Sequence, residues 1–392
     1  MKHIQLSVLI MLALLQVLFT HAQADSVQGR YHIAVFAPLY LDSAFDAGGN
    51  YRYDKNFPRF FSAGLEFWEG AQLAIDSMKK EGLQLEIHVY DTRSAIQKPE
   101  VVTREEDFKN TDLIIGHVTV NEAALLAHTA ATLGIPFINA NLPNDAGVTN
   151  NPHFVVLNAT LATHCTAIYK YLQKNFALSN IIIFRKKGVQ EDRLQEYLTD
   201  AAKTTSSVPL KVKYVTLENN FTVKQLLPHL DSNVTNVCLV GSLDAAFAQT
   251  ICQQLASVSS SYASTVFGMP TWEMVDFEKP VYKGIEIYYS TPFYTDPANK
   301  LVTALQEHFK TALFGYPSDM VYRGYETMYR FGHLLSDHGK NLSSSLGEKK
   351  YKVFNDFDIQ PVLNRKTMTL DYFENKKLYF IRKVDGAVKA VY

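Results

Sequence analysis

The feature that most constrains the fold is a regular alternation between short apolar segments and longer amphipathic segments. Residues 31–41 form an apolar run typical of a buried strand, and residues 64–80 place Leu65, Trp68 and Ala71 at helical spacing. Later strands are predicted at 83–90, 113–115, 136–139, 154–157, 180–184, 212–217, 236–240, 265–268 and 284–290. Strands that alternate with helices imply right-handed crossover connections. We therefore expect an α/β fold in which mostly parallel sheets are flanked by helices.

The length is consistent with two domains or one large one, and the composition excludes several classes of protein. The chain has 392 residues, of which 47% are hydrophobic and 20% are charged, a balance typical of globular proteins. Its 38 basic residues nearly match its 39 acidic residues, so we expect no nucleic-acid partner. Three cysteines cannot build a disulfide framework, and we expect them to be buried free thiols.

The first 24 residues carry the pattern of a signal peptide. Lys2 and His3 precede an apolar run over residues 4–19, which ends in the small-x-small motif Ala22-Gln23-Ala24. The alternative is an N-terminal membrane anchor, although this apolar core is short for one. We expect residues 1–24 to be cleaved and the protein to be periplasmic.

No catalytic or metal-binding signature stands out. The chain lacks the GxSxG, HExxH, GxGxxG and Walker A patterns. Asp356-Phe-Asp358 begins like a calcium loop, but Pro361 stands where that loop requires glycine. We therefore expect a protein that is not an enzyme and that uses no cofactor or metal.

Polar and aromatic side chains follow the predicted strands of the first half. Ligands of open α/β sheets bind beyond the carboxyl ends of the strands, so these side chains are candidate ligand contacts. His117 could equally be a buried loop histidine, and Thr119 could instead cap the helix that follows it. The candidates in this half are Tyr40, Asp42, His117, Thr119, Asn139 and Asn141.

The second half supplies further candidates at equivalent positions. Ser242 follows one predicted strand, and Trp272 follows the next, where we expect its indole at the exposed rim of a cleft. Tyr289 and Tyr322 could add aromatic walls or belong to the core. The aromatic-rich segment 41–62 is long for a loop, which suggests a lid or a partner surface.

Several stretches together resemble a known family, the type I periplasmic solute-binding proteins of the leucine/isoleucine/valine-binding kind. They are Ile33-Ala-Val-Phe-Ala-Pro-Leu39, Ile114-Ile-Gly-His117, Gly134-Ile-Pro136, residues 284–296, Gly324-Tyr325-Glu326 and the tail from Tyr372 to Gly386. The resemblance implies a type I fold with two lobes joined by three crossing strands, lobe 1 comprising residues 25–158 plus 290–336 and lobe 2 residues 159–289 plus 337–392. It also implies a small-molecule ligand in the interlobe cleft, closure by hinge motion, and a monomer that serves a membrane transporter.

The family's amino-acid-binding members place small hydroxyl residues after strands three and four. Here these positions read Gly116-His-Val-Thr-Val-Asn121 and Asn139-Ala-Asn-Leu-Pro143, so the ligand need not be an amino acid. Two hypotheses follow from the sequence. The chain is an exported receptor for a small polar solute, or it is a scaffold that regulates envelope or cell-wall assembly through an envelope protein partner.

Overall fold

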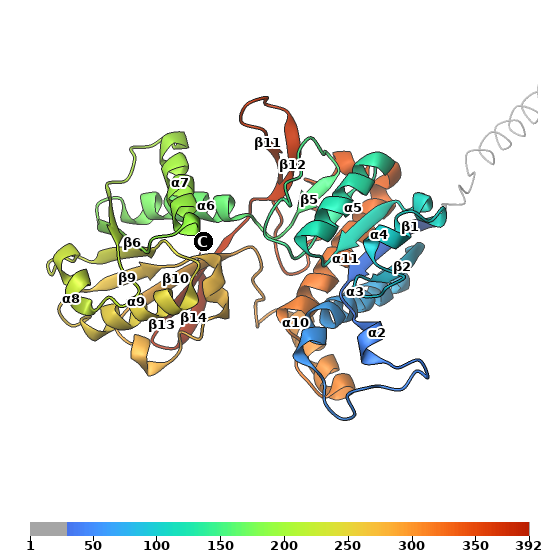
Figure 1. Cartoon of the computed structure of the whole chain (residues 1–392), viewed down its shortest axis with the longest axis horizontal. Coiled ribbons are helices and arrows are strands. Elements are labelled where there is room, and N and C mark those ends of the chain that lie inside the picture. The colour runs from blue at the N-terminus through green and yellow to red at the C-terminus, as the bar shows by residue number, and fades with distance from the viewer. Residues whose placement is uncertain (1–29, 392) are drawn as a thin grey trace, which may run out of the picture.

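The computed structural model describes residues 30–391, so the expected signal peptide at 1–24 lies outside the described residues. The described chain forms two lobes, each built on a seven-stranded sheet (Figure 1). Within residues 30–391, no helix combines the length and apolar character needed to cross a membrane. The expected α/β class, with two mostly parallel sheets flanked by helices, is confirmed.

The sheet of lobe 1 has the strand order β11-β12-β5-β4-β3-β1-β2. Neighbouring strands run parallel except β11 and β12, which pair antiparallel. The strands are β1 (Tyr31–Ala37), β2 (Leu85–Asp91), β3 (Leu113–Gly116), β4 (Phe137–Asn139), β5 (Phe154–Val156), β11 (Ile359–Leu363) and β12 (Leu370–Asn375). The central strands are buried on both faces, which explains their unbroken apolar sequences.

The sheet of lobe 2 has the order β14-β13-β10-β9-β8-β6-β7. Strand β13 pairs antiparallel with both of its neighbours, β10 and β14. The strands are β6 (Asn180–Arg185), β7 (Val212–Thr216), β8 (Asn236–Val240), β9 (Ser264–Phe267), β10 (Glu286–Thr291), β13 (Tyr379–Val384) and β14 (Ala387–Val391). A tight turn joins β13 to β14, and Asp385 and Gly386 adopt φ values of 46° and 83° there.

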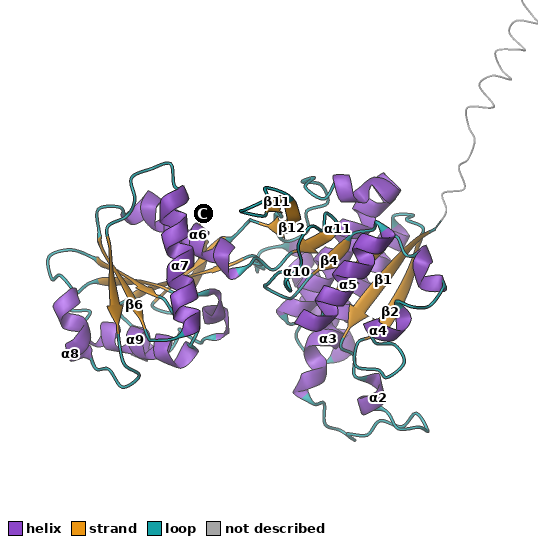
Figure 2. Ribbon diagram, turned by 45° about the horizontal axis from the view of Figure 1, so that its top comes forward, coloured by secondary structure: helices purple, strands orange, loops and turns teal. Residues whose placement is uncertain are grey.

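Helices cover both faces of each sheet (Figure 2). In lobe 1, α3 and α11 pack on one face and α5 on the other, and in lobe 2, α6 and α7 lie opposite α9. The α-helices are α2 (Leu41–Ala44), α3 (Ser62–Lys80), α4 (Pro99–Val102), α5 (Val120–Leu133), α6 (Leu161–Phe176), α7 (Val189–Thr204), α8 (Val223–Leu226), α9 (Ala245–Ser257), α10 (Lys300–His308) and α11 (Asp319–His338). Short helical turns are η1 (Arg59–Phe61), η2 (Asp107–Asn110), η3 (Leu227–His229), η4 (Pro270–Met274), η5 (Pro280–Tyr282), η6 (Phe309–Leu313) and η7 (Gly339–Ser344).

Three segments connect the lobes, at residues 157–160, 292–299 and 376–378. The expected placement of residues 337–392 in lobe 2 is wrong for most of that stretch. Strand β12 pairs with β5 of lobe 1, and only β13 and β14 join the second sheet. Strand β12 extends the sheet of lobe 1 beside β5, and the chain then crosses to lobe 2 through residues 376–378.

Two local expectations have clear outcomes. The predicted strand at 31–41 ends at Ala37, because the following residues turn around the carboxylate of Asp91. The three cysteines, Cys165, Cys238 and Cys252, are buried free thiols as expected.

Candidate functional site

A fully buried carboxylate shapes the loop that follows β1. Asp91, the last residue of β2, accepts the backbone N–H groups of Leu39 at 2.9 Å, Tyr40 at 3.1 Å and Leu41 at 2.7 Å. It also accepts the N–H of Arg93 at 2.9 Å. One side chain thereby satisfies the backbone donors of two loops at the carboxyl ends of adjacent parallel strands.

Tyr40 and Asp42 take part in this loop structure. Tyr40 adopts a left-handed conformation with φ 58°, and its ring meets the Phe60 ring edge-on at 5.0 Å between centroids. The Arg93 guanidinium lies 5.9 Å from the Tyr40 ring centre. Asp42 accepts the N–H of Ala95 at 3.0 Å and so braces the β1 loop against the β2 loop.

His117 lies directly after β3, and its N–H donates to the Phe36 carbonyl at 2.8 Å. Its ring is 5.6 Å from the Phe67 ring of α3. Burial, together with the nearby charges of Arg323 and Arg93, lowers the pKa of His117 from 6.5 to about 4. The imidazole is therefore neutral at pH 7 and can both donate and accept a hydrogen bond.

The asparagines after β4 hold loops together. Asn139 is fully buried and exchanges two hydrogen bonds with Leu142, at 2.9 and 3.0 Å. Asn141 accepts the Val118 N–H at 2.8 Å and donates to the Val118 carbonyl at 3.2 Å. Thr119 caps α5 through a capping box with Glu122, so the alternative interpretation of Thr119 as a helix cap is confirmed.

In lobe 2, Ser242 is fully buried beyond the end of β8. Its hydroxyl donates to Glu191 at 2.6 Å and accepts the Asp244 N–H at 3.2 Å. Asp244 caps α9 and also pairs with Lys186 at 2.5 Å. These contacts tie the loops after β6 and β8 together.

The expected position of Trp272 at an exposed rim is wrong. Its side chain is 0% exposed and packs in the core of lobe 2, 5.0 Å from the Phe277 ring. Gly268 makes this possible, because a Cβ there would lie only 1.9 Å from the indole. Tyr289 on β10 and Tyr322 on α11 are likewise core residues, each about 6% exposed.

Sequence reasoning missed the polar groups that lie where the lobes meet. Arg323 of α11 stacks on Phe293 with its guanidinium carbon 3.8 Å from the ring centre, and Phe293 belongs to the second connection. Glu273 of η4 comes from lobe 2 and accepts the Thr291 hydroxyl at 3.1 Å. Although Glu273 is an exposed residue, desolvation of its carboxyl group raises its pKa, and the Arg323 charge opposes that shift. Arg323 is one of several charged residues in the segment that forms α11, so its position in the sequence does not distinguish it from a surface charge.

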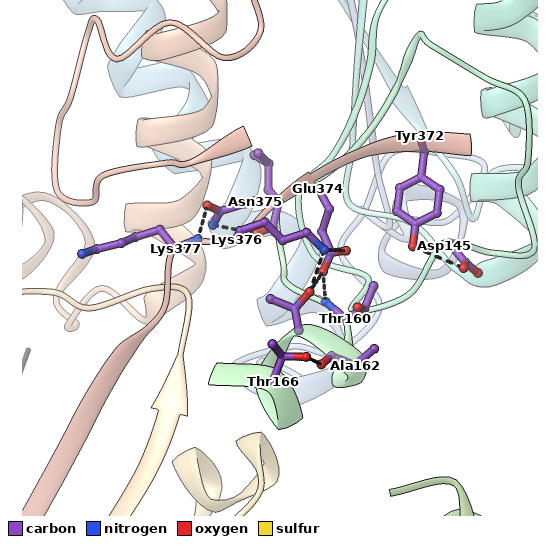
Figure 3. A network of polar contacts seen from close by, with 11 residues as sticks. Asp145, Thr160, Ala162, Thr166, Tyr372, Glu374, Asn375, Lys376 and Lys377 are labelled. Atoms are coloured by element: carbon purple, nitrogen blue, oxygen red, sulfur yellow. Dashed lines mark hydrogen bonds and ion pairs between the residues drawn. The ribbon is translucent and has the colours of Figure 1, made fainter. Parts of the chain in front are cut away.

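A second polar network fastens the connections to one another (Figure 3). Glu374, which is 1% exposed at the end of β12, accepts the Thr160 N–H at 2.7 Å and the Thr163 hydroxyl at 2.6 Å. Lys376 pairs with Glu374 at 2.5 Å and donates to the Thr163 hydroxyl at 2.8 Å. The neighbouring Asn375 amide donates to the Leu157 carbonyl at 3.2 Å. The first and third connections are thus joined side by side.

Within residues 30–391, one group of side chains has the spacing of metal ligands. Glu86 lies 3.8 Å from His32 and 3.2 Å from His88, on the edge strand β2 and its neighbour β1. His32 is at the amino-terminal end of β1, about 16 Å along the strand from Ala37. This group is therefore separate from the loops at the carboxyl ends of the strands.

The long segment after β1 is held by its own aromatic rings. Phe60 and Phe61 lie 4.3 Å apart, and Tyr53 meets both rings edge-on. Leu41, Phe45, Phe57 and Phe60 each remain 42–54% exposed. The segment is a structured aromatic surface of lobe 1, and its role as a lid or partner surface stays a prediction.

Comparisons with known proteins agree with this architecture. A protein of Rhodospirillum rubrum described as a branched-chain amino acid ABC transporter has a TM-score of 0.67 at 11% identity, over 92% of this chain and 100% of the other. A branched-chain amino acid ABC transporter periplasmic ligand-binding protein of Burkholderia xenovorans has a TM-score of 0.61 at 13% identity, over 93% and 95%. An ABC transporter substrate-binding protein of Desulfitobacterium hafniense has a TM-score of 0.58 at 13% identity, over 93% and 100%.

At these identities the solved structures show a shared fold. No curated protein sequence matches the chain significantly. The sequence profile of the family described as "Periplasmic binding protein" matches residues 60–348, well over half of the chain. The chain therefore belongs to the periplasmic binding protein family.

Proposed function

We propose that the protein captures a small polar solute between its lobes and delivers it for uptake by a membrane transporter. The observation that carries this proposal is a chain of contacts from lobe 2 to lobe 1: the Thr291 hydroxyl contacts Glu273 and the Phe293 carbonyl, and the Phe293 ring lies under Arg323. Family membership supports the same function, as do the structural relatives named for ABC transporters.

The binding surface of lobe 1 consists of the loops that Asp91 and Asn141 hold in place, with His117 and Tyr40 as side-chain contacts. Lobe 2 contributes Glu273 on η4. The connections act as a hinge, and the bound solute stabilises the closed arrangement through its higher affinity for that state. Residues 1–24 serve as a cleaved signal peptide, and the mature chain acts as a monomer without enzymatic activity.

A thermal-shift screen of the mature chain tests this function. The panel contains amino acids, organic acids, sugars, nucleosides, short peptides and cell-wall fragments. A solute at about 100 times its dissociation constant adds about 2.7 kcal/mol of stability, which gives a clear increase in Tm. A folded protein that responds to no solute would contradict solute capture and would favour the scaffold hypothesis.

A distance measurement tests whether binding closes the lobes. Cysteine substitutions at the exposed Lys55 of lobe 1 and Lys279 of lobe 2 accept a fluorophore pair, because the three native cysteines are buried. We expect the solute found in the screen to change the transfer efficiency between the dyes. Stabilisation with unchanged transfer efficiency would place the solute outside the interlobe region.

A further inference from the structure

Arg323 is a buried charged residue whose guanidinium lacks, within the described chain, the hydrogen-bonding partners that neighbouring charged groups have. Its side chain is 9% exposed, and among residues 30–391 it forms no hydrogen bond or ion pair. Its Nε is buried without a partner. A buried guanidinium is costly to the fold unless a partner compensates it, so its retention here indicates a partner from outside the chain.

The neighbouring groups are already occupied. Arg330, two turns further along α11, donates to the carbonyls of Lys350 and Glu348. Arg93 pairs with Glu122 at 3.1 Å. Glu326 accepts the N–H of Phe354 at 2.9 Å and the Asn355 side-chain amide at 2.8 Å. The carboxylates of Glu273 and Asp319 are close enough to act on the Arg323 charge, but neither forms a hydrogen bond or ion pair with it within residues 30–391. Its donors are therefore unused.

The surroundings of Arg323 place it where a solute would lie. Phe293, under the guanidinium, belongs to the connection between the lobes. The Arg323 charge also influences the pKa of His117 at the end of β3 and that of Glu273 in lobe 2. The guanidinium is thus close to the strand-end loops of one lobe and to a loop of the other.

We propose that Arg323 binds a carboxylate of the solute, so that the ligands of this protein are organic acids. This inference rests on the proposed function. The fork of guanidinium N–H groups matches the two oxygens of a carboxylate, and Phe293 holds the plane of the fork. A single unpaired guanidinium favours one carboxylate over a phosphate dianion, because Arg93 is already neutralised by Glu122.

Carboxylate–amide pairs test this assignment. Binding of L-leucine and L-leucinamide, L-glutamate and L-glutamine, and succinate and succinamide is measured by thermal shift and calorimetry, with sugars and nucleosides as neutral probes. We expect the acid of at least one pair to bind and its amide to bind ten- to a hundredfold more weakly. Arg323→Met should lower affinity for that acid by a similar factor, and Arg323→Lys should restore part of it.

The stability of these variants separates a binding role from a structural one. Arg323→Met removes an unpaired buried charge, so its Tm without solute should equal or exceed that of the wild type. The matched change Arg330→Met breaks two hydrogen bonds to carbonyls, so it should lower Tm while keeping the preference for acids over amides. A lower Tm for Arg323→Met with unchanged affinity would assign Arg323 a structural role and overturn the inference.

Other outcomes are equally decisive. Binding of a sugar or nucleoside, with no acid bound, would overturn this inference and leave solute capture intact. Equal binding of an acid and its amide would do the same. A folded wild-type chain that binds no solute would overturn both proposals.

Discussion

The carboxylate of Glu374 accepts the backbone N–H of Thr160 at 2.7 Å, across 214 positions of sequence. Glu374 is the penultimate residue of the last strand of lobe 1, and Thr160 is the N-cap of the helix that opens lobe 2. This bond joins two of the three connections at the point about which the lobes would rotate. The hinge is therefore a buried polar structure as well as a set of covalent crossings.

Glu374→Gln should destabilise the protein by about 1–3 kcal/mol, because it leaves Lys376 and the Thr163 hydroxyl without their charged acceptor. Urea denaturation at pH 7 measures the change. The matched control is Glu106→Gln, which breaks an exposed pair with Lys109 and should change stability by less than about 0.5 kcal/mol. Equal effects of the two changes would show that the hinge contact adds nothing to stability.

Gly324→Ala should destabilise the protein by about 1–3 kcal/mol, although alanine is the better helix former. A Cβ at Gly324 would lie 1.9 Å from the Phe67 carbonyl oxygen, where α11 crosses α3. The control is Gly315→Ala, whose Cβ would meet nothing closer than 3.9 Å. Thermal unfolding compares the two variants, and a neutral Gly324→Ala would contradict the close packing of these helices.

His117→Gln should change how stability depends on pH. The folded-state pKa of His117 is about 4, below its ordinary value of 6.5, because the site is buried and two arginines are near. The unfolded chain therefore binds the proton more readily, and wild-type stability falls as pH decreases from 6.5 to 4. The advantage of the wild type over His117→Gln should shrink across this window. If the stabilities of the two proteins changed with pH in the same way, His117 would not be buried as described.

Glu326→Gln should give the opposite pH dependence. Burial raises the pKa of Glu326 from 4.5 to about 7, against the hydrogen bonds from Asn355 and Phe354. The folded state then holds the proton more tightly than the unfolded chain, so stability falls as pH rises from 4.5 to 7. The advantage of the wild type over Glu326→Gln should decrease over that window. An advantage that grows with pH would mean that the hydrogen bonds outweigh burial.

Much of the fold follows from local patterns. The apolar strands β3 and β4 and the amphipathic helix α3 could be predicted because period and burial are read directly from neighbouring residues. The C-terminal strands show the limit of prediction from local patterns. Strands β12 and β13 follow one another closely in the chain, but their local sequences do not reveal that they belong to different lobes. Strand partners are set by long-range packing, which leaves no local signature.

The candidate site was predicted less completely than the fold. The sequence by itself determined that polar residues such as His117 and Asn141 follow the strands, because strand ends are visible in the pattern. Only the tertiary structure decided which of these residues form hydrogen bonds that hold the loops in place. It also decided that Trp272 is buried, with its indole packed against Gly268. It also brought Glu273 toward Arg323, residues 50 positions apart in sequence and carried by different lobes. Local order depends on neighbours along the chain, whereas pairing and burial depend on which distant segments the fold brings together.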